Sequence, residues 1–218
     1  QTNHYELEAR AINPQIIEEL TYYYDDPMFD PSMIPTYLLS EAISKNFKVA
    51  LSGDGGDELF GGYNHYSKLA RLKKFSNLVP YFFRQSLNNL SQNVLPLGFR
   101  GRKTVELLSS NFIDSYPNTN EFFSDKEQEI FFSNFFANKA IPSPERTHDQ
   151  SNIISDYGLR ATFHDFTNYL SEDLLVKIDR ASMANGIEVR APFLDKDLVE
   201  FAFTKVPSSL KFDCKNRK

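Results

Sequence analysis

A short apolar segment that runs directly into an acidic glycine loop limits the folds open to this chain of 218 residues. Residues 47–51 (FKVAL) are apolar except for one lysine, and they end at the sequence SGDGG. An apolar run of this kind, between a predicted helix and a glycine loop, is typical of a buried parallel strand. Strand, loop and helix in succession form the repeating unit of α/β folds, in which ligands bind at the carboxyl ends of strands. The sequence therefore predicts an α/β fold with a binding site just after residue 51.

Most of the other segments are predicted to be helices. Alternation of apolar and polar residues over residues 4–9 predicts one further short strand. Pro14 and Pro35 each stand where a helix begins, because proline is tolerated in the first turn. A later helix is expected to begin at Ser171 and to end at Gly186, with a final helix capped by its own N-cap aspartate, Asp195. The expected fold is a helix-rich α/β domain with a small parallel sheet.

The chain divides into three predicted parts. Residues 1–75 contain the glycine loop, and residues 151–218 contain a charged helix. Residues 76–150 are aromatic and helix-rich, and residues 76–140 hold no cluster of candidate catalytic groups, so residues 76–150 are assigned as a helical scaffold. The chemistry is therefore expected in the first and third parts.

Composition excludes several classes of protein. An apolar fraction of 41% with 14% aromatic residues excludes intrinsic disorder. Asp and Glu number 29 against 24 Lys and Arg, which argues against a nucleic-acid-binding domain. The single cysteine, Cys214, excludes an internal disulfide, and no apolar run approaches the length of a membrane helix. Together with the polar start of the chain, at Gln1, these features predict a cytoplasmic piece of a longer protein, without a membrane or nucleic-acid partner.

The glycine loop, SGDGGDELFGGY at residues 52–63, combines backbone freedom with three carboxylates. Asp54, Asp57 and Glu58 fall close together among the glycines. A loop that held phosphate directly would not be this negative, because like charges repel. A divalent cation between the carboxylates and the phosphates resolves the conflict, and Mg²⁺ is favoured because it prefers oxygen ligands.

The alternative interpretation of this loop is structural. A tight turn followed by a helix with acidic residues in its first turn would give the same spacing, and the loop matches neither an EF-hand nor a Walker loop. Gly61 and Gly62 favour the functional interpretation, because each costs about 1 kcal/mol relative to alanine in a purely structural helix.

The charged helix is the second informative segment. Apolar residues are spread around most of its predicted circumference, which indicates a buried helix, yet Lys177, Asp179 and Arg180 lie in its middle. A buried charge is costly unless it is paired or bound to a ligand. Lys177 and Arg180 share one flank, where they could meet an anionic ligand together. The alternative is a structural ion-pair network, which is the simpler explanation for Asp179, Glu188 and Arg190.

The motifs resemble the synthetase domain of the asparagine synthetase (glutamine-hydrolysing) family. The resemblance rests on SGDGGDELFGGY, on DLLVKIDRASMANGIEVRAPFLD, on the opening TNHYELEA and on the loop DDPMFDPSMIPTYLLSEA. It covers residues 2–75 and 155–218 well and residues 76–150 loosely. It implies a partial ATP-pyrophosphatase-type domain, similar to the adenine nucleotide alpha hydrolases, with a parallel sheet flanked by helices.

The resemblance also implies a chemistry. In this family the domain uses ATP to convert the side-chain carboxylate of aspartate into an adenylate, with release of pyrophosphate. Ammonia, released from glutamine by a separate N-terminal glutaminase domain, then gives asparagine and AMP. An adenylating enzyme needs a metal and fixed cations around the leaving pyrophosphate, and a carboxylate to accept a proton from the amine. The expected substrates are therefore aspartate and ATP, with Mg²⁺.

Four loop residues match functional positions of the family. Ser52 and Gly53 match positions that meet the adenosine part of ATP. Asp57 matches a ligand of the Mg²⁺–pyrophosphate group. Asp54 matches the carboxylate that handles the proton during ammonia attack.

Three basic residues complete the expected site. Arg180 matches a basic position near the phosphates, and Lys177 is its neighbour on the helical wheel. The terminal sequence SLKFDCKNRK looks like the start of the family's last basic motif, so Lys218 matches a lysine that stabilises pyrophosphate.

The chain departs from the family pattern in two respects. Asp54 replaces the usual glutamate and withdraws the carboxylate by roughly 1.5 Å, which would impair or retune a positioned base. The sequence also contains neither a cysteine glutaminase nor the Ser-Gly-Gly-x-Asp-Ser pyrophosphate loop, so this piece alone is expected to be inactive.

Two alternative functions and one possible oligomeric state remain open. The acceptor can be another carboxylate, as in lactam-forming relatives or in surface-polysaccharide synthesis. The chain can also be a non-catalytic module for binding or assembly. An exposed sheet edge would favour pairing with a second copy, so a homodimer is one expected assembly.

Overall fold

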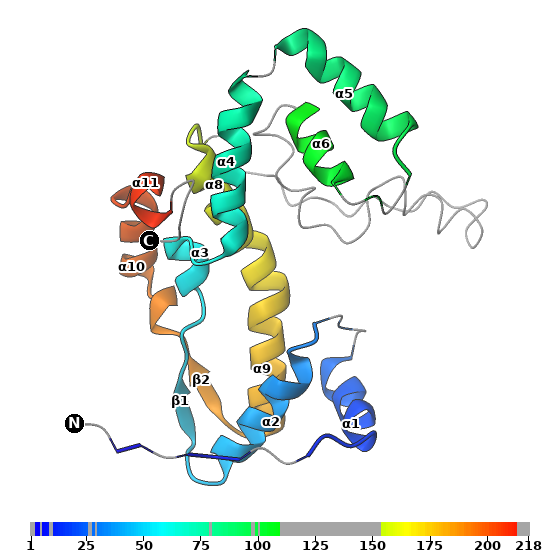
Figure 1. The fold of residues 1–218 in the computed structure, drawn as a ribbon. Coiled ribbons are helices and arrows are strands. Elements are labelled where there is room, and N and C mark those ends of the chain that lie inside the picture. Colours follow the sequence, from blue (N-terminus) through cyan, green and yellow to red (C-terminus); the bar gives the residue numbers. More distant parts are fainter. Residues whose placement is uncertain are drawn as a thin grey trace. The chain divides into compact units, whose positions relative to one another are not determined.

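Two short parallel strands form the sheet of this domain. The structure is a computed structural model, and it describes residues 3–4, 6–8, 11–25, 28, 30–78, 80–96, 99, 101–109 and 154–212. Strand β1 (Val49–Leu51) pairs with strand β2 (Glu188–Arg190), and Val49 lies opposite Glu188 (Figure 1). The Ser52 amide donates to the Arg190 carbonyl at 2.9 Å and so extends the ladder by one bond. The predicted small parallel sheet in a helix-rich chain is confirmed, but the prediction that its first strand is buried is wrong: Val49 is 48% exposed and Leu51 is 73% exposed. A sheet of only two described strands leaves the apolar side chains of β1 without a full covering layer.

The further strand predicted at residues 4–9 is wrong for the residues described there. His4 and residues 6–8 belong to no strand, and Leu7 is 40% exposed. Alternating residues form a strand only where a neighbouring strand supplies hydrogen bonds and an apolar surface.

The chain divides by its internal contacts into two units. The first unit comprises residues 1–60 and 165–205, and the second comprises residues 61–164 and 206–218. The division into residues 1–75, 76–150 and 151–218 stays a prediction.

Three helices make the core of the first unit. Helices α1 (Gln15–Tyr24) and α2 (Met33–Ser44) both pack against helix α9 (Leu175–Ala184) (Figure 1). The predicted helices after Pro14 and around Pro35 are therefore confirmed. Their buried contacts come from apolar residues of all three helices: Ile16, Leu20, Tyr24, Tyr37, Leu38 and Ala181.

Helix α9 continues a helical segment that begins earlier than predicted. A π-helical stretch, η3 (Phe166–Leu174), precedes α9 directly and follows helix α8 (Tyr157–Asp165). Ser171 therefore lies inside this stretch, and its hydroxyl donates to the Thr167 carbonyl at 2.7 Å instead of capping a new helix. The prediction of a helix start at Ser171 is wrong.

The end of α9 follows the sequence closely. Gly186 has φ +63°, and its amide donates to the Met183 carbonyl at 3.0 Å. The Ile187 amide donates to the Ser182 carbonyl at 3.0 Å, which completes a Schellman motif. This turn reverses the chain from α9 into β2 and confirms that Gly186 ends the helix.

The expectation that the charged helix is buried all round is wrong. Met183 is 65% exposed and Val176 is 36% exposed, whereas Lys177 is only 6% exposed. One flank of α9 faces α1 and α2, and apolar residues elsewhere on the helix stay at the surface.

The first unit ends in a capped helix. A single 3₁₀ turn, η4 (Pro192–Leu194), leads to helix α10 (Lys196–Thr204). The Asp195 carboxylate accepts from the Asp197 amide at 3.0 Å and from the Leu198 amide at 3.4 Å. The predicted N-cap is confirmed.

The second unit is helical in its described part. It contains helices α4 (Asn64–Leu78), α5 (Tyr81–Asn93), α6 (Arg102–Ser109) and α11 (Ser208–Lys211), together with most of α8. Its core joins Phe212, which follows α11, to residues of α4 and α8: Tyr66, Leu69, Ala70 and Ala161. The predicted scaffold beyond residue 109 lies outside the described residues. No described helix is long and apolar enough to cross a bilayer.

Candidate functional site

The acidic glycine loop leaves the carboxyl end of β1, as the sequence predicts. The Gly56 amide donates back to the Gly53 carbonyl at 3.2 Å, which closes the turn. Gly55 has φ +86°, a conformation that other residues rarely adopt, and a Cβ there would collide with the Leu194 side chain. Glycine at this position is therefore required by both the backbone and the packing.

Helix α3 (Gly56–Phe60) presents two neighbouring carboxylates in different surroundings. Asp57 is exposed, whereas Glu58 is only 1% exposed. Both lie in the first turn, where a negative charge is favourable. Because of this difference, Asp57 is open to a ligand from solvent, and Glu58 belongs to the interior.

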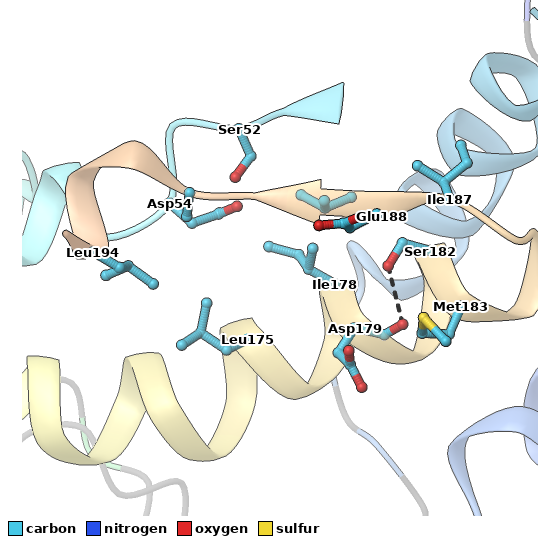
Figure 2. Close-up of a pocket in the computed structure, with 12 residues that line it drawn as sticks. Ser52, Asp54, Leu175, Ile178, Asp179, Ser182, Met183, Ile187, Glu188 and Leu194 are labelled. Carbon is cyan, nitrogen blue, oxygen red and sulfur yellow. Dashed lines mark hydrogen bonds between the residues drawn. The ribbon is translucent and has the colours of Figure 1, made fainter. Parts of the chain in front are cut away.

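A pocket of about 300 Å³ lies between the strands and α9 (Figure 2). Figure 2 shows Ser52 and Asp54 on the strand side and Leu175 and Ile178 reaching toward them from α9. The lining residues come from β1 and its loop, from α9, and from β2 with the turn after it: Ser52, Asp54, Leu175, Ile178, Asp179, Ser182, Met183, Ile187, Glu188, Val189, Ala191 and Leu194. The pocket therefore joins the two segments that the sequence singled out.

Ser52 places a hydroxyl group in the wall of this pocket. Its Oγ is buried and has no hydrogen-bond partner among the residues that the structure describes. A buried hydroxyl without a partner costs free energy, and such a group in a native structure calls for an explanation. A ligand that bonds to this oxygen would supply the explanation.

The charges around the pocket are negative. Asp54, Asp179 and Glu188 line it, and its lining residues include no lysine, arginine or histidine. Figure 2 shows the Asp179 side chain pointing away from the strands. Because phosphate groups would be repelled here, the pocket suits a neutral or cationic part of a ligand.

The two predicted cations of α9 do not line the pocket. The Lys177 Nζ lies 2.5 Å from Asp30 Oδ2 and donates to Ser32 Oγ at 2.6 Å. The Arg180 guanidinium is exposed and donates to the Tyr23 carbonyl at 3.4 Å. Both side chains therefore reach toward α1 and the loop after it.

The structure does not bring all the predicted site residues together. Ser52 and Asp54 line the pocket with Gly53 between them, whereas Asp57 is not a lining residue. Lys218 lies outside the described residues. Within the described part of the chain, no three histidine, cysteine, aspartate or glutamate side chains gather closely enough to hold a metal ion.

Sequence reasoning assigned no role in the site to three residues that the structure brings forward. Glu188 lines the pocket, and its Oε1 accepts a hydrogen bond from Arg190 Nε at 2.7 Å. Arg190 ends β2 directly beside Ser52 and is a largely exposed cation at the sheet's carboxyl edge. The run GIEVRAP is a short strand pattern ended by proline, which could have predicted this position. Asp30, in contrast, gave no signal beyond its place in a proline-rich loop.

The comparisons with known proteins identify the family of the chain. A family model described as "Asparagine synthase" matches residues 1–218. "Asparagine synthetase [glutamine-hydrolyzing] 1" of Bacillus subtilis is 32% identical over 208 residues, which cover 93% of this chain and 32% of that protein. "Putative asparagine synthetase [glutamine-hydrolyzing]" of Mycobacterium tuberculosis strain H37Rv is 31% identical over 202 residues, which cover 89% of this chain and 29% of that protein.

A more distant relative has a different name. "Amidase chry2" of Gibberella zeae is 24% identical over 209 residues, which cover 89% of this chain and 31% of that protein. The comparison with solved structures gave no match. The chain spans about a third of the length of the curated relatives that it matches. Because the family model matches from the first residue to the last, the chain belongs to the asparagine synthase family.

Proposed function

We propose that the protein to which this chain belongs is an ATP-dependent ligase that forms an amide, with this chain as most of its synthetase domain. In this function a side-chain carboxylate of aspartate attacks the α-phosphorus of ATP, and pyrophosphate leaves. Ammonia, supplied from glutamine by a separate domain, then attacks the acyl carbon, and AMP leaves. The products are asparagine, AMP and pyrophosphate.

The observation that supports this proposal most is the unpartnered Ser52 hydroxyl in the pocket at the carboxyl end of β1. Ligands of parallel α/β sheets bind at this end of the strands. The lining carboxylates disfavour phosphate groups, so the pocket would take the neutral adenosine part of the nucleotide. Ser52 and Gly53 would then meet adenosine, and the phosphates would lie outside the pocket.

The remaining roles are assigned by residue type and position. Asp54 reaches the pocket and would accept the proton from the attacking amine. Asp57, exposed at the start of α3, would hold Mg²⁺ together with the phosphates of ATP, since Mg²⁺ in such sites often has only one or two protein carboxylates. The ion, when bound, would neutralise the phosphates. Arg180 and Lys218 would stabilise the leaving pyrophosphate.

A substitution of Asp57 tests this proposal in the full-length protein. Asp57→Asn keeps the size of the side chain but removes the charge that would hold the metal. We expect pyrophosphate release to fall by at least about 100-fold, in the range seen when one electrostatic contact to a transition state is removed. Lys196→Met, which removes a cation that is 85% exposed on α10, is the control and should release pyrophosphate normally. Normal turnover of Asp57→Asn would contradict the proposal.

A second candidate function keeps the chemistry and changes the acceptor. Asp54 is shorter than the usual glutamate, and one relative is named an amidase. Formation of AMP from ATP, followed with aspartate and with a panel of other carboxylic acids, distinguishes the two acceptors. AMP formation with aspartate alone supports the first function, and AMP formation with another acid alone supports the second. No AMP with any acid would favour a non-catalytic module.

A further inference from the structure

Both the ammonium group and the backbone carbonyl of Lys177 form contacts with other segments of the first unit. Its ammonium group contacts Asp30 Oδ2 and Ser32 Oγ, at 2.5 and 2.6 Å. Its backbone carbonyl accepts a hydrogen bond from the Tyr24 hydroxyl at 2.8 Å. The Lys177 side chain is 7% exposed, and Tyr24 is 5% exposed. These contacts join α9 to the end of α1 and to the loop before α2.

Asp30 is as fully engaged as its partner. Its Oδ1 accepts hydrogen bonds from the Ser32 amide and the Ser32 hydroxyl, each at 2.7 Å, and its Oδ2 faces Lys177. Burial alone would raise the pKa of Asp30, but the hydrogen bonds from Lys177 and Ser32 outweigh it, so that the pKa is lowered. The carboxylate is therefore ionised at neutral pH, and the pair is a part-buried, hydrogen-bonded ion pair.

The flank of α9 that carries Lys177 faces the loop before α2, and the neighbouring flank lines the pocket. Ile178 and Asp179 follow Lys177 directly in the helix, and Leu175 precedes it by two residues; all three line the pocket. Successive residues of a helix are rotated by about 100°, so a helix that is held at Lys177 presents a fixed flank to the strands. Holding Lys177 therefore sets the position of the pocket wall that α9 supplies.

We propose that Lys177 is a positioning residue for this pocket and not a ligand of the nucleotide. The proposal rests on the proposed function, since it assigns the pocket to the reaction. Lys177 acts through Asp30: the ion pair holds α9 so that Leu175 and Ile178 face Ser52 and Asp54. A phosphate ligand, in contrast, would need an ammonium group that is not already bound by a carboxylate and a hydroxyl.

The surroundings of the pair predict an unequal result for its two partners. Asp173 lies one helical turn before Lys177; burial raises the pKa of Asp173, the nearby Asp30 raises it further, and Lys177 lowers it. Without Lys177, Asp30 would remain as an uncompensated, part-buried charge beside Asp173. Without the charge of Asp30, Lys177 still has Ser32 and Asp173 nearby. Lys177→Met should therefore do more damage than Asp30→Asn, and the double variant should be less damaged than Lys177→Met.

The experiment is a double-mutant cycle in the full-length protein, with AMP formation as the readout. Lys177→Met, Asp30→Asn and the double variant are compared with the exposed control Lys196→Met. We expect Lys177→Met to lower kcat by about tenfold or more, because small displacements of a site cost one to two orders of magnitude. The KM for ATP of Lys177→Met should differ from that of the wild type by less than about twofold. The kcat of the double variant should be at least about threefold higher than the kcat of Lys177→Met.

Three results would overturn the proposal. The first is a large increase in the KM for ATP in Lys177→Met that Asp30→Asn does not show and that remains the same size in the double variant. This result would make Lys177 a ligand of ATP. An unchanged kcat per folded molecule in Lys177→Met would make the pair structural only. If Lys177→Met does not fold, Asp30→Asn and the double variant decide, and wild-type kcat in both would overturn the positioning role.

A failure of the proposed function would look different. Wild-type protein that forms no AMP with any acid would overturn that function. Hydrogen exchange at the amides of residues 52–54 and 187–189 would then decide the positioning role. Faster exchange in Lys177→Met that the second substitution slows again supports it, and exchange equal to that of Lys196→Met overturns it.

Discussion

Among the described residues, each of the two units buries one lysine, and the two lysines are treated differently. Lys177 in the first unit is 6% exposed and bonds to a carboxylate and a hydroxyl. Lys211 in the second unit is 2% exposed, and burial lowers its pKa from 10.5 to about 8, although attraction to Asp156 opposes the shift. The comparison teaches that depth alone does not decide the energetic effect of a lysine: hydrogen bonds to Asp30 and Ser32 accompany the burial of Lys177, whereas desolvation dominates the pKa of Lys211.

The largest expected effect on stability comes from replacing Lys177, the lysine that stabilises its unit. Lys177→Met should lower the free energy of unfolding of the full-length protein by about 2–3 kcal/mol, because it leaves the part-buried Asp30 carboxylate without its charged hydrogen-bond donor. Urea denaturation followed by circular dichroism measures the change. A loss below about 1 kcal/mol, the value of an exposed pair, would mean that the ion pair is not desolvated in solution.

The opposite sign is expected for the other lysine. Lys211→Met should raise the free energy of unfolding at pH 7 by about 2–3 kcal/mol, since a lowered lysine pKa means that burial of the charged form costs free energy. Between pH 8 and pH 10.5 the unfolded chain holds this proton and the folded chain has lost it. The stability of the wild type should therefore rise with pH across that window.

The advantage of Lys211→Met should fade as the pH rises and disappear near pH 10.5. Urea denaturation at several pH values between 7 and 10.5 follows the difference between the two proteins. A difference that is constant with pH would contradict the titration of Lys211 and would leave a packing effect of the methionine instead.

Acid should act on the Lys177 pair through its carboxylate. The folded pKa of Asp30 lies below its ordinary value of 3.8, so the pair stabilises the protein at every pH above that value and loses its effect as the pH falls through the lower, folded pKa. Asp30→Asn should therefore unfold with a weaker dependence on pH below 4 than the wild type. Parallel acid-denaturation curves for the two proteins would show that the carboxylate contributes nothing.

The smallest effect on stability is expected for an ordinary polar contact, the N-cap of α10, which involves neither lysine. Asp195→Ala removes the N-cap of α10 and should lower the free energy of unfolding by about 1 kcal/mol. Thermal unfolding of the full-length protein, beside Asp195→Asn as the conservative variant, measures it. A cost equal to that of Lys177→Met would mean that the buried pair is no stronger than a surface cap.

Features that depend on neighbouring residues could be predicted from the sequence. The strand before Ser52, the Schellman turn at Gly186 and the cap at Asp195 each depend on a few consecutive residues. The acidic loop was also found in this way, because glycines and carboxylates alternate over a short stretch. Local chemistry therefore predicted the position of the loop after β1, but not which residues of α9 face it.

Features that depend on distant partners could not be predicted. Lys177 carries a charge in a helix, and its sequence neighbourhood fits a phosphate ligand as well as an ion pair; only Asp30, far earlier in the chain, distinguishes the two. The start at Ser171 was misplaced for a related reason. A serine followed by acidic residues favours an N-cap, but the helix already present before Ser171 leaves no free amides to cap.

The sequence distance across the Lys177 pair has a consequence for biosynthesis. Asp30 and Lys177 are 147 residues apart in the sequence. Strand β1 also pairs with a strand that is synthesised much later, β2. At about 5–20 residues per second, the ribosome needs on the order of ten seconds to make the segment between them. During that interval α1 and α2 leave the exit tunnel with Ile16 and Leu20 lacking α9 to cover them. Until α9 emerges, the apolar faces of α1 and α2 are therefore exposed surface of the kind that chaperones bind.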